Sequence, residues 1–297
     1  MTDALISFEP ATGEELWRSA VSDVDSEVEA ARRAWPEWAS KAVTYRSETL
    51  RRFVDRVKAE SETLADLIAR ETGKPLWEAR TEVESVANKV DISIKAYAER
   101  TPNRRIEGAM GLRNAVRHKP HGTLAVLGPY NFPAHLPNGH IVPALLAGNT
   151  LVFKPSELTP KVAEFTVQLW EKAGIPAGVL NLVQGEVDTG KALSVHPQID
   201  GLYFTGSSNT GHLLHKQFGG RPDKILALEM GGNNPLIVTD VADVDAAVHT
   251  IVQSAYITSG QRCTCARRLF IEAGEKGQAV LDRLVEVTKN IVVDDYE

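Results

Sequence analysis

Two side chains in the later part of the sequence could together carry out covalent chemistry. Cys263 lies in the segment Ser259–Arg268, and Glu229 lies earlier, in a Glu-Met-Gly-Gly turn. A thiolate attacks carbonyl carbon well, and a carboxylate held nearby can activate the water that releases an acyl group from sulfur. With a glycine-framed phosphate site between Phe204 and Gly211, the pair predicts oxidation of an aldehyde through a thioester.

The residues around Cys263 favour a reactive thiol. Gly260, Gln261 and Arg262 precede it and form a polar, permissive segment. Nearby cations and backbone amides lower the pKa of a thiol. The alternative is that Cys263 is a small buried hydrophobe, as free cysteines often are, and spacing alone leaves both interpretations open. Cys265 lacks a comparable frame, so we expect it to pack in the interior.

The cysteines and histidines do not predict a metal site. Structural zinc sites use four ligands in paired spacings, and the pair Cys263 and Cys265 has no second cysteine pair in the sequence. The histidines interleaved with prolines do not share one helical face; these are His118, His121, His135 and His140. We therefore expect no metal.

Two turns after predicted strands could present catalytic groups. Glu229 follows the apolar run Lys224–Leu228 and precedes two glycines, which allow a sharp bend. Asn131 lies in the turn Gly128–Pro133, where its amide could donate to a developing oxyanion. The alternatives are a carboxylate that caps or pairs locally and an asparagine used for turn chemistry.

Two further turns could hold a dinucleotide. A strand-to-helix turn can bind pyrophosphate with backbone amides and the helix N-terminus; here its residues are Gly206, Ser207, Ser208, Asn209, Thr210 and Gly211. The Gly-x4-Gly spacing also fits turn chemistry alone. Lys154 could bond ribose hydroxyls, and Glu157 could accept from the adenosine 2′-hydroxyl and repel a 2′-phosphate, which favours NAD over NADP. The alternative for this pair is a capped helix with a surface ion pair.

Alternating short strands and helices after residue 122 position these turns. The expected strands are Leu124–Leu127, Thr150–Phe153, Val179–Val183, Gly201–Phe204, Ile225–Leu228, Leu236–Val238 and Leu269–Ile271. The expected helices between and after them are Pro137–Ala147, Pro160–Ala173, Gly190–Val195, Gly211–Gln217, Val244–Tyr256 and Gly277–Asn290. Apolar strands separated by helices predict a parallel sheet covered on both faces.

The first 120 residues have a different pattern. A first helix, capped by Asp23 or Asp25, is expected to run through Trp38. Further helices are expected from Thr44 to Thr72 and from Pro75 to about Arg100, and a hairpin or arm from Arg104 to His118.

Composition excludes several classes of protein. The chain has 297 residues, a formal net charge of −6 and a hydrophobic content of 43%. An acidic chain without a Lys/Arg block is a poor candidate for binding nucleic acid or anionic membrane. No apolar run approaches the ~20 residues of a membrane-spanning helix, and no secretion signal is visible. Together with the two cysteines, too close to form a disulfide framework, this predicts a cytoplasmic protein.

Taken together, the motifs resemble the aldehyde dehydrogenase superfamily. They are Asn131 in Tyr-Asn-Phe-Pro, Lys154 in Lys-Pro-Ser-Glu, Gly206 to Gly211, Glu229 in Glu-Met-Gly-Gly and Cys263 in Gly-Gln-x-Cys, and they cover almost the whole chain. The resemblance implies an α/β fold. It comprises a Rossmann-type NAD-binding domain over residues 1–232, with an oligomerisation arm near 102–120, and an incomplete α/β catalytic domain over 233–297.

Four segments narrow the resemblance to the succinylglutamate-semialdehyde dehydrogenase group: Asn88–Tyr97, Tyr130–Pro143, Glu229–Pro235 and Gly260–Arg268. The group's activity is NAD-dependent oxidation of N-succinyl-L-glutamate 5-semialdehyde to N-succinyl-L-glutamate, in arginine degradation by the succinyltransferase pathway. The implied partners are a small-molecule aldehyde and copies of the chain in a homo-oligomer. The alternatives are another hydrolytic aldehyde dehydrogenase, a coenzyme-A-acylating one, which would generally lack a base at Glu229, and a non-catalytic scaffold.

The resemblance also assigns roles. Cys263 is the nucleophile, the Asn131 amide helps to hold the oxyanion, and Glu229 activates water. Ser207 contacts pyrophosphate, while Lys154 and Glu157 hold the adenosine ribose. Arg262, beside the nucleophile, is the candidate for binding a substrate carboxylate.

The ends of the chain depart from the family pattern. The sequence begins close to Phe8, which leaves little room for the strand that many relatives carry before that point, and it stops at Glu297, where relatives continue. We therefore expect the front part of such an enzyme. On its own, this chain is expected to be inactive and poorly soluble because a sheet edge would lack its partner.

Overall fold

A five-stranded parallel sheet lies at the centre of the computed structural model, which describes residues 4–296. In spatial order its strands are β7 (Leu180–Leu182), β6 (Thr150–Lys154), β5 (Thr123–Leu127), β8 (Gly201–Gly206) and β9 (Ile225–Met230). The chain runs outward from β5 to β7 and then returns to the other side of β5 with β8 and β9. The order of the strands therefore reverses between β5 and β8, and in open α/β sheets ligands bind at such a reversal, beyond the carboxyl ends of the strands.

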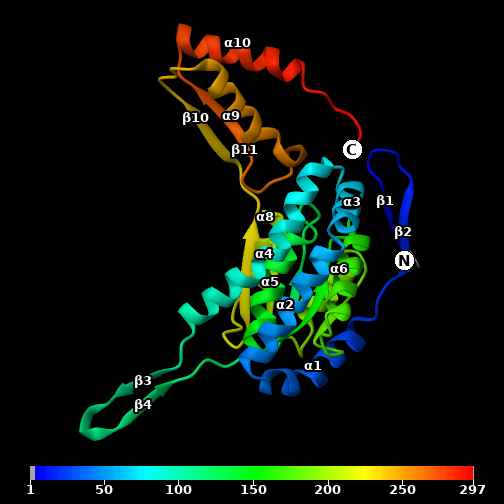
Figure 1. The fold of residues 1–297 in the computed structure, drawn as a ribbon, viewed down its shortest axis with the longest axis vertical. Helices are drawn as coiled ribbons and strands as arrows, with labels where there is room; N and C mark the ends of the chain where they lie inside the picture. The colour runs from blue at the N-terminus through cyan, green and yellow to red at the C-terminus, as the bar shows by residue number, and fades with distance from the viewer. Residues whose placement is uncertain (1–3, 297) are drawn as a thin grey trace.

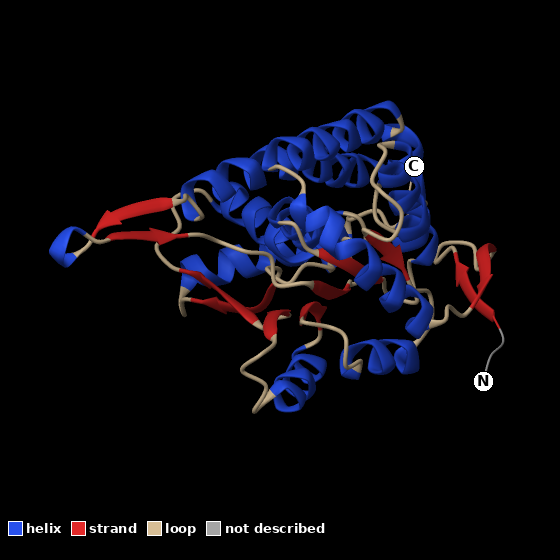
Figure 2. Cartoon of the chain, turned by 90° about the horizontal axis from the view of Figure 1, so that it is seen from below, coloured by secondary structure: helices blue, strands red, loops and turns tan. Residues whose placement is uncertain are grey.

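Helices cover both faces of this sheet (Figures 1 and 2). The apolar core on one face includes residues of α1 (Val24–Ser40), α7 (Val187–Val195) and α8 (Ser208–Phe218). The core on the other face includes residues of α2 (Val43–Ala59), α3 (Ser61–Thr72), α4 (Leu76–Arg100), α5 (His135–Ala147) and α6 (Pro160–Lys172). Alternate residues of β5 enter different cores, Leu124 and Val126 one and Ala125 the other. The doubly covered α/β sheet predicted from the sequence is confirmed. Among residues 4–296, no helix combines the length and apolarity needed to cross a bilayer.

The last two predicted strands do not join this sheet. β10 (Asn234–Val238) and β11 (Ala266–Ile271) pair in parallel with each other, and α9 (Val244–Tyr256) and α10 (Glu275–Lys289) pack on them around a small apolar core. Figure 1 shows this group projecting beyond the ends of the helices that cover the larger sheet. The separate pair is consistent with the expectation that residues 233–297 begin a second α/β domain, since the chain leaves the large sheet after β9.

Two hairpins lie outside the central sheet. β3 (Arg104–Glu107) and β4 (Arg113–Val116) form the hairpin expected there, with the short helix η1 (Ala109–Gly111) at its tip, and it extends away from the body (Figure 1). β1 (Ala4–Phe8) pairs antiparallel with β2 (Glu15–Ala20). The expectation of little room for a strand before Phe8 was wrong, because five residues suffice once β2 supplies their hydrogen-bonding partner.

The helix expected from Thr44 to Thr72 is two helices, α2 and α3. Glu60 separates them with a non-helical backbone (φ −113°, ψ 24°). The Glu60 N–H still donates to Arg56 O, and the Leu64 N–H donates to Glu60 O. Because hydrogen bonding and the apolar stripe both continue across the break, the sequence pattern did not show it.

Candidate active site

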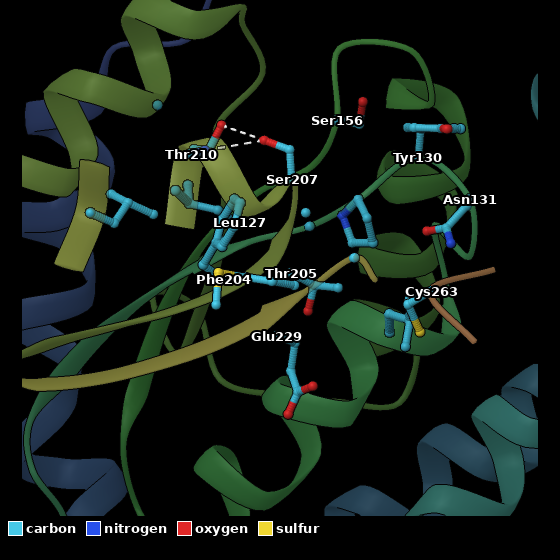
Figure 3. Close-up of a pocket in the computed structure, with 18 of the residues that line it drawn as sticks. Leu127, Tyr130, Asn131, Ser156, Phe204, Thr205, Ser207, Thr210, Glu229 and Cys263 are labelled. Carbon is cyan, nitrogen blue, oxygen red and sulfur yellow. Dashed lines mark hydrogen bonds between the residues drawn. The ribbon is translucent and has the colours of Figure 1, made fainter. Parts of the chain in front are cut away.

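Most of the predicted site residues line one cavity of about 850 Å³ at the carboxyl ends of the sheet strands. Its walls include the carboxyl ends of β5, β6, β8 and β9 with the turns that follow them, which we call the sheet wall. They also include residues of the segment Ile257–Cys263, which we call the cysteine loop. Figure 3 shows Glu229, Cys263 and Asn131 around the same hollow, with Ser207 and Thr210 on another side. Of the twelve residues proposed from the sequence, nine line the cavity: Asn131, Lys154, Glu157, Gly206, Ser207, Thr210, Glu229, Arg262 and Cys263.

Glu229 lies within strand β9. The sequence had predicted it in the turn that follows the strand. Its backbone pairs with Thr205 of β8, and the strand continues to Met230 before the two glycines. The side chain is exposed and lines the cavity. The register of β8 and β9 therefore fixes the position of this carboxylate.

The phosphate turn connects β8 to α8. Ser207 caps the helix, since its hydroxyl accepts from the Thr210 N–H at 3.1 Å. Ser208, Asn209 and Gly211 lie in the first turn of α8 but do not line the cavity. A Cβ at Gly211 would lie 2.3 Å from the Met230 sulfur, so this glycine allows α8 to pack closely against β9.

Lys154 and Glu157 form an ion pair at the end of β6. The Lys154 Nζ lies 3.2 Å from a Glu157 carboxylate oxygen. Burial lowers the pKa of Lys154, and the neighbouring Glu157 charge opposes that effect. Both side chains line the cavity, so the pair is not confined to the outer surface.

The two cysteines differ in their surroundings. Cys263 is exposed and lines the cavity. Cys265 is buried, with its sulfur 3.8 Å from the Ile257 carbonyl oxygen, so the predicted packing role of Cys265 is confirmed. The Asn234 amide donates to the carbonyl oxygens of both cysteines, at 2.7 and 3.1 Å, and thereby connects the cysteine loop to the start of β10.

The cysteine loop holds two non-glycine residues in the left-handed region, Thr258 (φ 58°) and Ser259 (φ 50°). Such conformations persist only where the surroundings hold them. A Glu78 carboxylate oxygen from α4 accepts the buried Thr258 N–H at 2.8 Å. The Thr258 hydroxyl in turn accepts from Arg262 Nε at 2.8 Å. Glu78 therefore holds the loop that carries the nucleophile candidate.

Asn131 joins the sheet wall to the cysteine loop. Its side-chain amide donates to the Gln261 carbonyl at 2.7 Å, which leaves one of its two amide hydrogens available. Its backbone carbonyl accepts from Lys74 Nζ at 2.7 Å. Lys74 also pairs with Glu82 at 2.7 Å, and their side chains are only 1% and 0% exposed. The other Glu82 oxygen accepts the N–H groups at the start of α5, from Ala134 and His135.

The sequence of this chain is similar to those of known proteins. A family model described as "Aldehyde dehydrogenase family" matches residues 2–297. The chain belongs to the aldehyde dehydrogenase family.

Named relatives within the aldehyde dehydrogenase family are similar over nearly the whole chain. The N-succinylglutamate 5-semialdehyde dehydrogenases of Sphingopyxis alaskensis and Paraburkholderia xenovorans are 69% and 60% identical to it, each over 99% of this chain and 61% of the relative. A betaine aldehyde dehydrogenase of Staphylococcus aureus, solved as a point mutant in complex with NAD⁺, superposes with a TM-score of 0.92 at 28% identity, over 99% of this chain and 60% of that one. The chain thus spans about three fifths of the length of these relatives.

One wall of the cavity was not predicted from the sequence. Lys89 of α4 and two histidines of α5, His135 and His140, line it. His140 stacks on Tyr203 and lies 3.1 Å from the Thr205 hydroxyl. Burial, with a smaller contribution from the Lys89 charge, lowers the pKa of His140 to about 4. The sequence does contain one sign of the α4 part of this wall: the spacing of Glu78, Glu82 and Lys89 places these charged side chains on one face of the helix.

No cluster of three metal-ligating side chains occurs in the part of the chain that the structure describes. Arg262, the proposed substrate residue, lines the cavity with its guanidinium 5.4 Å from the Phe132 ring centre. Within residues 4–296 the only hydrogen bond of its guanidinium is the one from Nε to Thr258. Its terminal nitrogens are therefore available to a ligand.

Proposed function

We propose that the complete protein containing this sequence oxidises an aldehyde to a carboxylic acid with NAD, and that the aldehyde is N-succinyl-L-glutamate 5-semialdehyde, in arginine degradation. The main observation behind the proposal is that Cys263, Asn131 and Glu229 line the same cavity as the turn between β8 and α8. The relatives named N-succinylglutamate 5-semialdehyde dehydrogenase support the choice of substrate.

The residues present fit a dinucleotide. The turn Gly206–Ser207 brings the N-terminus of α8 to the cavity, where free N–H groups and the helix dipole favour a phosphate. Lys154 and Glu157 lie at the end of β6, on the side where an adenosine ribose would be held. NAD bound there would accept the hydride that leaves the aldehyde carbon.

The residues of the chain supply the remaining chemistry. The Cys263 thiolate adds to the aldehyde carbon, and the oxyanion that forms accepts from the Asn131 amide and the Cys263 N–H. Loss of hydride leaves an acyl group on the sulfur. Glu229 takes a proton from water, the water oxygen adds to the acyl carbon, and the bond to sulfur breaks to release the acid and the thiolate.

Proposals for the domains and for oligomerisation follow from membership of the same family. We propose that residues 1–232 bind the cofactor and that residues 233–297 belong to the catalytic domain. The hairpin of β3 and β4 fits an oligomerisation arm, because its four largest apolar side chains, Ile106, Met110, Leu112 and Val116, are all exposed.

A single-turnover experiment tests the two chemical roles. In the protein expressed from its complete reading frame, Glu229→Gln should still form NADH in a burst of one equivalent per site, while steady-state acid release falls by about 10²-fold or more. Cys263→Ala should abolish both the burst and the turnover. Cys265→Ala serves as the matched control and should keep both.

Two results would contradict the proposal. Normal steady-state turnover by Glu229→Gln would mean that another group activates water. Turnover that depended on added coenzyme A would make the thiol, and not water, the acyl acceptor.

A further inference from the structure

Lys89 presents to the cavity a cation that comes from a different element than Arg262 of the cysteine loop. It lies on α4, is half-buried, and lines the cavity with His135, Gly139 and His140 of α5. A Cβ atom placed on Gly139 would lie 4.0 Å from Lys89 Nζ and 3.9 Å from its Cε. The end of the lysine side chain therefore lies over the one position of this wall that has no side chain.

No carboxylate of the described residues pairs with Lys89. The two glutamates on the same face of α4 have other partners: Glu82 pairs with Lys74, and Glu78 accepts the Thr258 N–H. A cation that is partly removed from water without a partner loses hydration that nothing replaces. An anionic ligand in the cavity would supply the missing partner.

The neighbours of Lys89 do not compete for that anion. Burial lowers the pKa of both His135 and His140, and the charge of Lys89 adds to this, while the Glu82 charge partly opposes it at His135. Both imidazoles are therefore neutral near pH 7, and the buried Nδ1 of His135 has no partner among residues 4–296. Lys89 is the charged group on this wall, and the histidines offer neutral hydrogen-bonding positions beside it.

We propose that Lys89 binds one carboxylate of the aldehyde substrate and makes the site selective for aldehydes that carry two carboxylates, with Arg262 available for the second. The inference deepens the proposed function and rests on it for the identity of the substrate. N-Succinylglutamate semialdehyde carries two carboxylates on a long chain, which two separate cations in one cavity can bind. Gly139 contributes by leaving the ammonium open to the cavity.

Two variants and a matched control test the role of Lys89. Lys89→Met, in the protein from its complete reading frame, should raise KM for N-succinylglutamate semialdehyde by about 10- to 100-fold, the loss expected for one charge-assisted hydrogen bond. Its kcat/KM for propanal should stay within about twofold. Lys89→Arg should restore much of the affinity, and Lys95→Met, an exposed lysine on the same helix outside the cavity, should change neither value. Gly139→Leu should reproduce the loss by covering the ammonium.

Binding of the acid N-succinyl-L-glutamate, measured by calorimetry, separates this inference from the proposed function. If wild type binds the acid and Lys89→Met binds it at least tenfold more weakly, the role of Lys89 stands. That conclusion holds even if wild type does not oxidise the aldehyde, a result that would overturn only the proposed function. If wild type oxidises that aldehyde while Lys89→Met has unchanged KM and unchanged acid binding, the function stands and Lys89 has no such role. An equal loss for propanal and the dicarboxylate aldehyde would also overturn it.

Discussion

The sheet wall and the cysteine loop, which both line the cavity, are held in place by different means. Glu229 on the sheet wall is placed by backbone pairing between β8 and β9. The cysteine loop has no such ladder; instead, side chains hold it from Glu78, Asn131 and Asn234. Two of its residues, Thr258 and Ser259, have left-handed backbones without being glycine.

The two regions should therefore differ in their sensitivity to the loss of a single side chain. A sheet register is shared among many hydrogen bonds, so removal of one side chain leaves the Glu229 backbone in place. The cysteine loop depends on a few side-chain contacts, and the one from Glu78 holds the strained backbone of Thr258. We therefore expect substitutions at the loop's anchors to impair the thiol chemistry while cofactor binding persists.

The largest effect is expected at Lys74, which supports the Asn131 turn between the two regions. Lys74→Met would leave the Glu82 charge buried without its partner, which costs about 3–5 kcal/mol of the free energy of unfolding. Urea denaturation measures it. Arg80→Met is the control, because the Arg80–Glu62 pair is half-exposed and such pairs contribute about 1 kcal/mol or less. Equal losses in the two variants would show that burial of the Lys74 pair has no consequence.

His140 of α5, whose ring stacks on Tyr203 of β8, gives the stability of the fold a dependence on pH. Its pKa is about 4 in the folded protein, below the ordinary value of 6.5, so the unfolded chain binds this proton more tightly. The stabilisation is fully present above pH 6.5 and is lost as the pH falls toward 4, by about 3 kcal/mol at most. Urea denaturation at pH 7, 6, 5 and 4 should show a shallower loss for His140→Phe than for wild type. His249→Asn, at an exposed site, should follow wild type, and parallel curves for His140→Phe would rule out the effect.

Glu78→Ala tests the cysteine loop directly. The buried Thr258 N–H would lose its acceptor, which costs about 1–3 kcal/mol, and a displaced loop can lower kcat by about 10²-fold. The rate of Cys263 alkylation should change, while the Kd for NAD stays within about twofold. The control is Glu84→Ala, an exposed glutamate on the same helix. If cofactor binding fell in step with the thiol chemistry, the two regions would not be separable.

The smallest effect is expected at Glu157 on the sheet wall. Glu157→Gln removes a partly exposed charge that would repel a 2′-phosphate, so the ratio of kcat/KM for NAD to that for NADP should fall about tenfold, or about 1.4 kcal/mol. Steady-state kinetics with both cofactors measures it, and Glu171→Gln, an exposed glutamate of α6, is the control. A wild-type preference for NADP would remove this role from Glu157.

Local patterns predicted the sheet wall because strands and their turns are encoded by neighbouring residues. Apolar runs followed by glycine or proline gave the strands of the central sheet, and their shared direction placed Asn131, Lys154 and Gly206 at one edge. The strand β9 extended further than its apolar run because Glu229 and Met230 still pair with β8.

The anchors of the cysteine loop were not predictable in this way. The contact between Glu78 and Thr258 joins residues 180 positions apart, and no local pattern marks it. Left-handed Thr258 and Ser259 are unexpected from residue type, since glycine usually occupies that region. Ser208, Asn209 and Gly211 lie in the first turn of α8 and do not line the cavity, so their assignment to cofactor binding stays a prediction.

Helix α4 acts as a spacer of fixed length between two functions. Glu78, Glu82 and Lys89 are four and seven residues apart, which places them on one side of the helix. A rise of 1.5 Å per residue separates Glu78, at the cysteine loop, from Lys89 by about 16 Å along the axis. The deletion of one residue between Glu82 and Lys89 would turn the lysine by about 100° around the axis and keep the helix intact. The distance between the cysteine loop and Lys89 is therefore set by the number of residues between Glu78 and Lys89 in one helix. It does not depend on the loops that carry the catalytic residues.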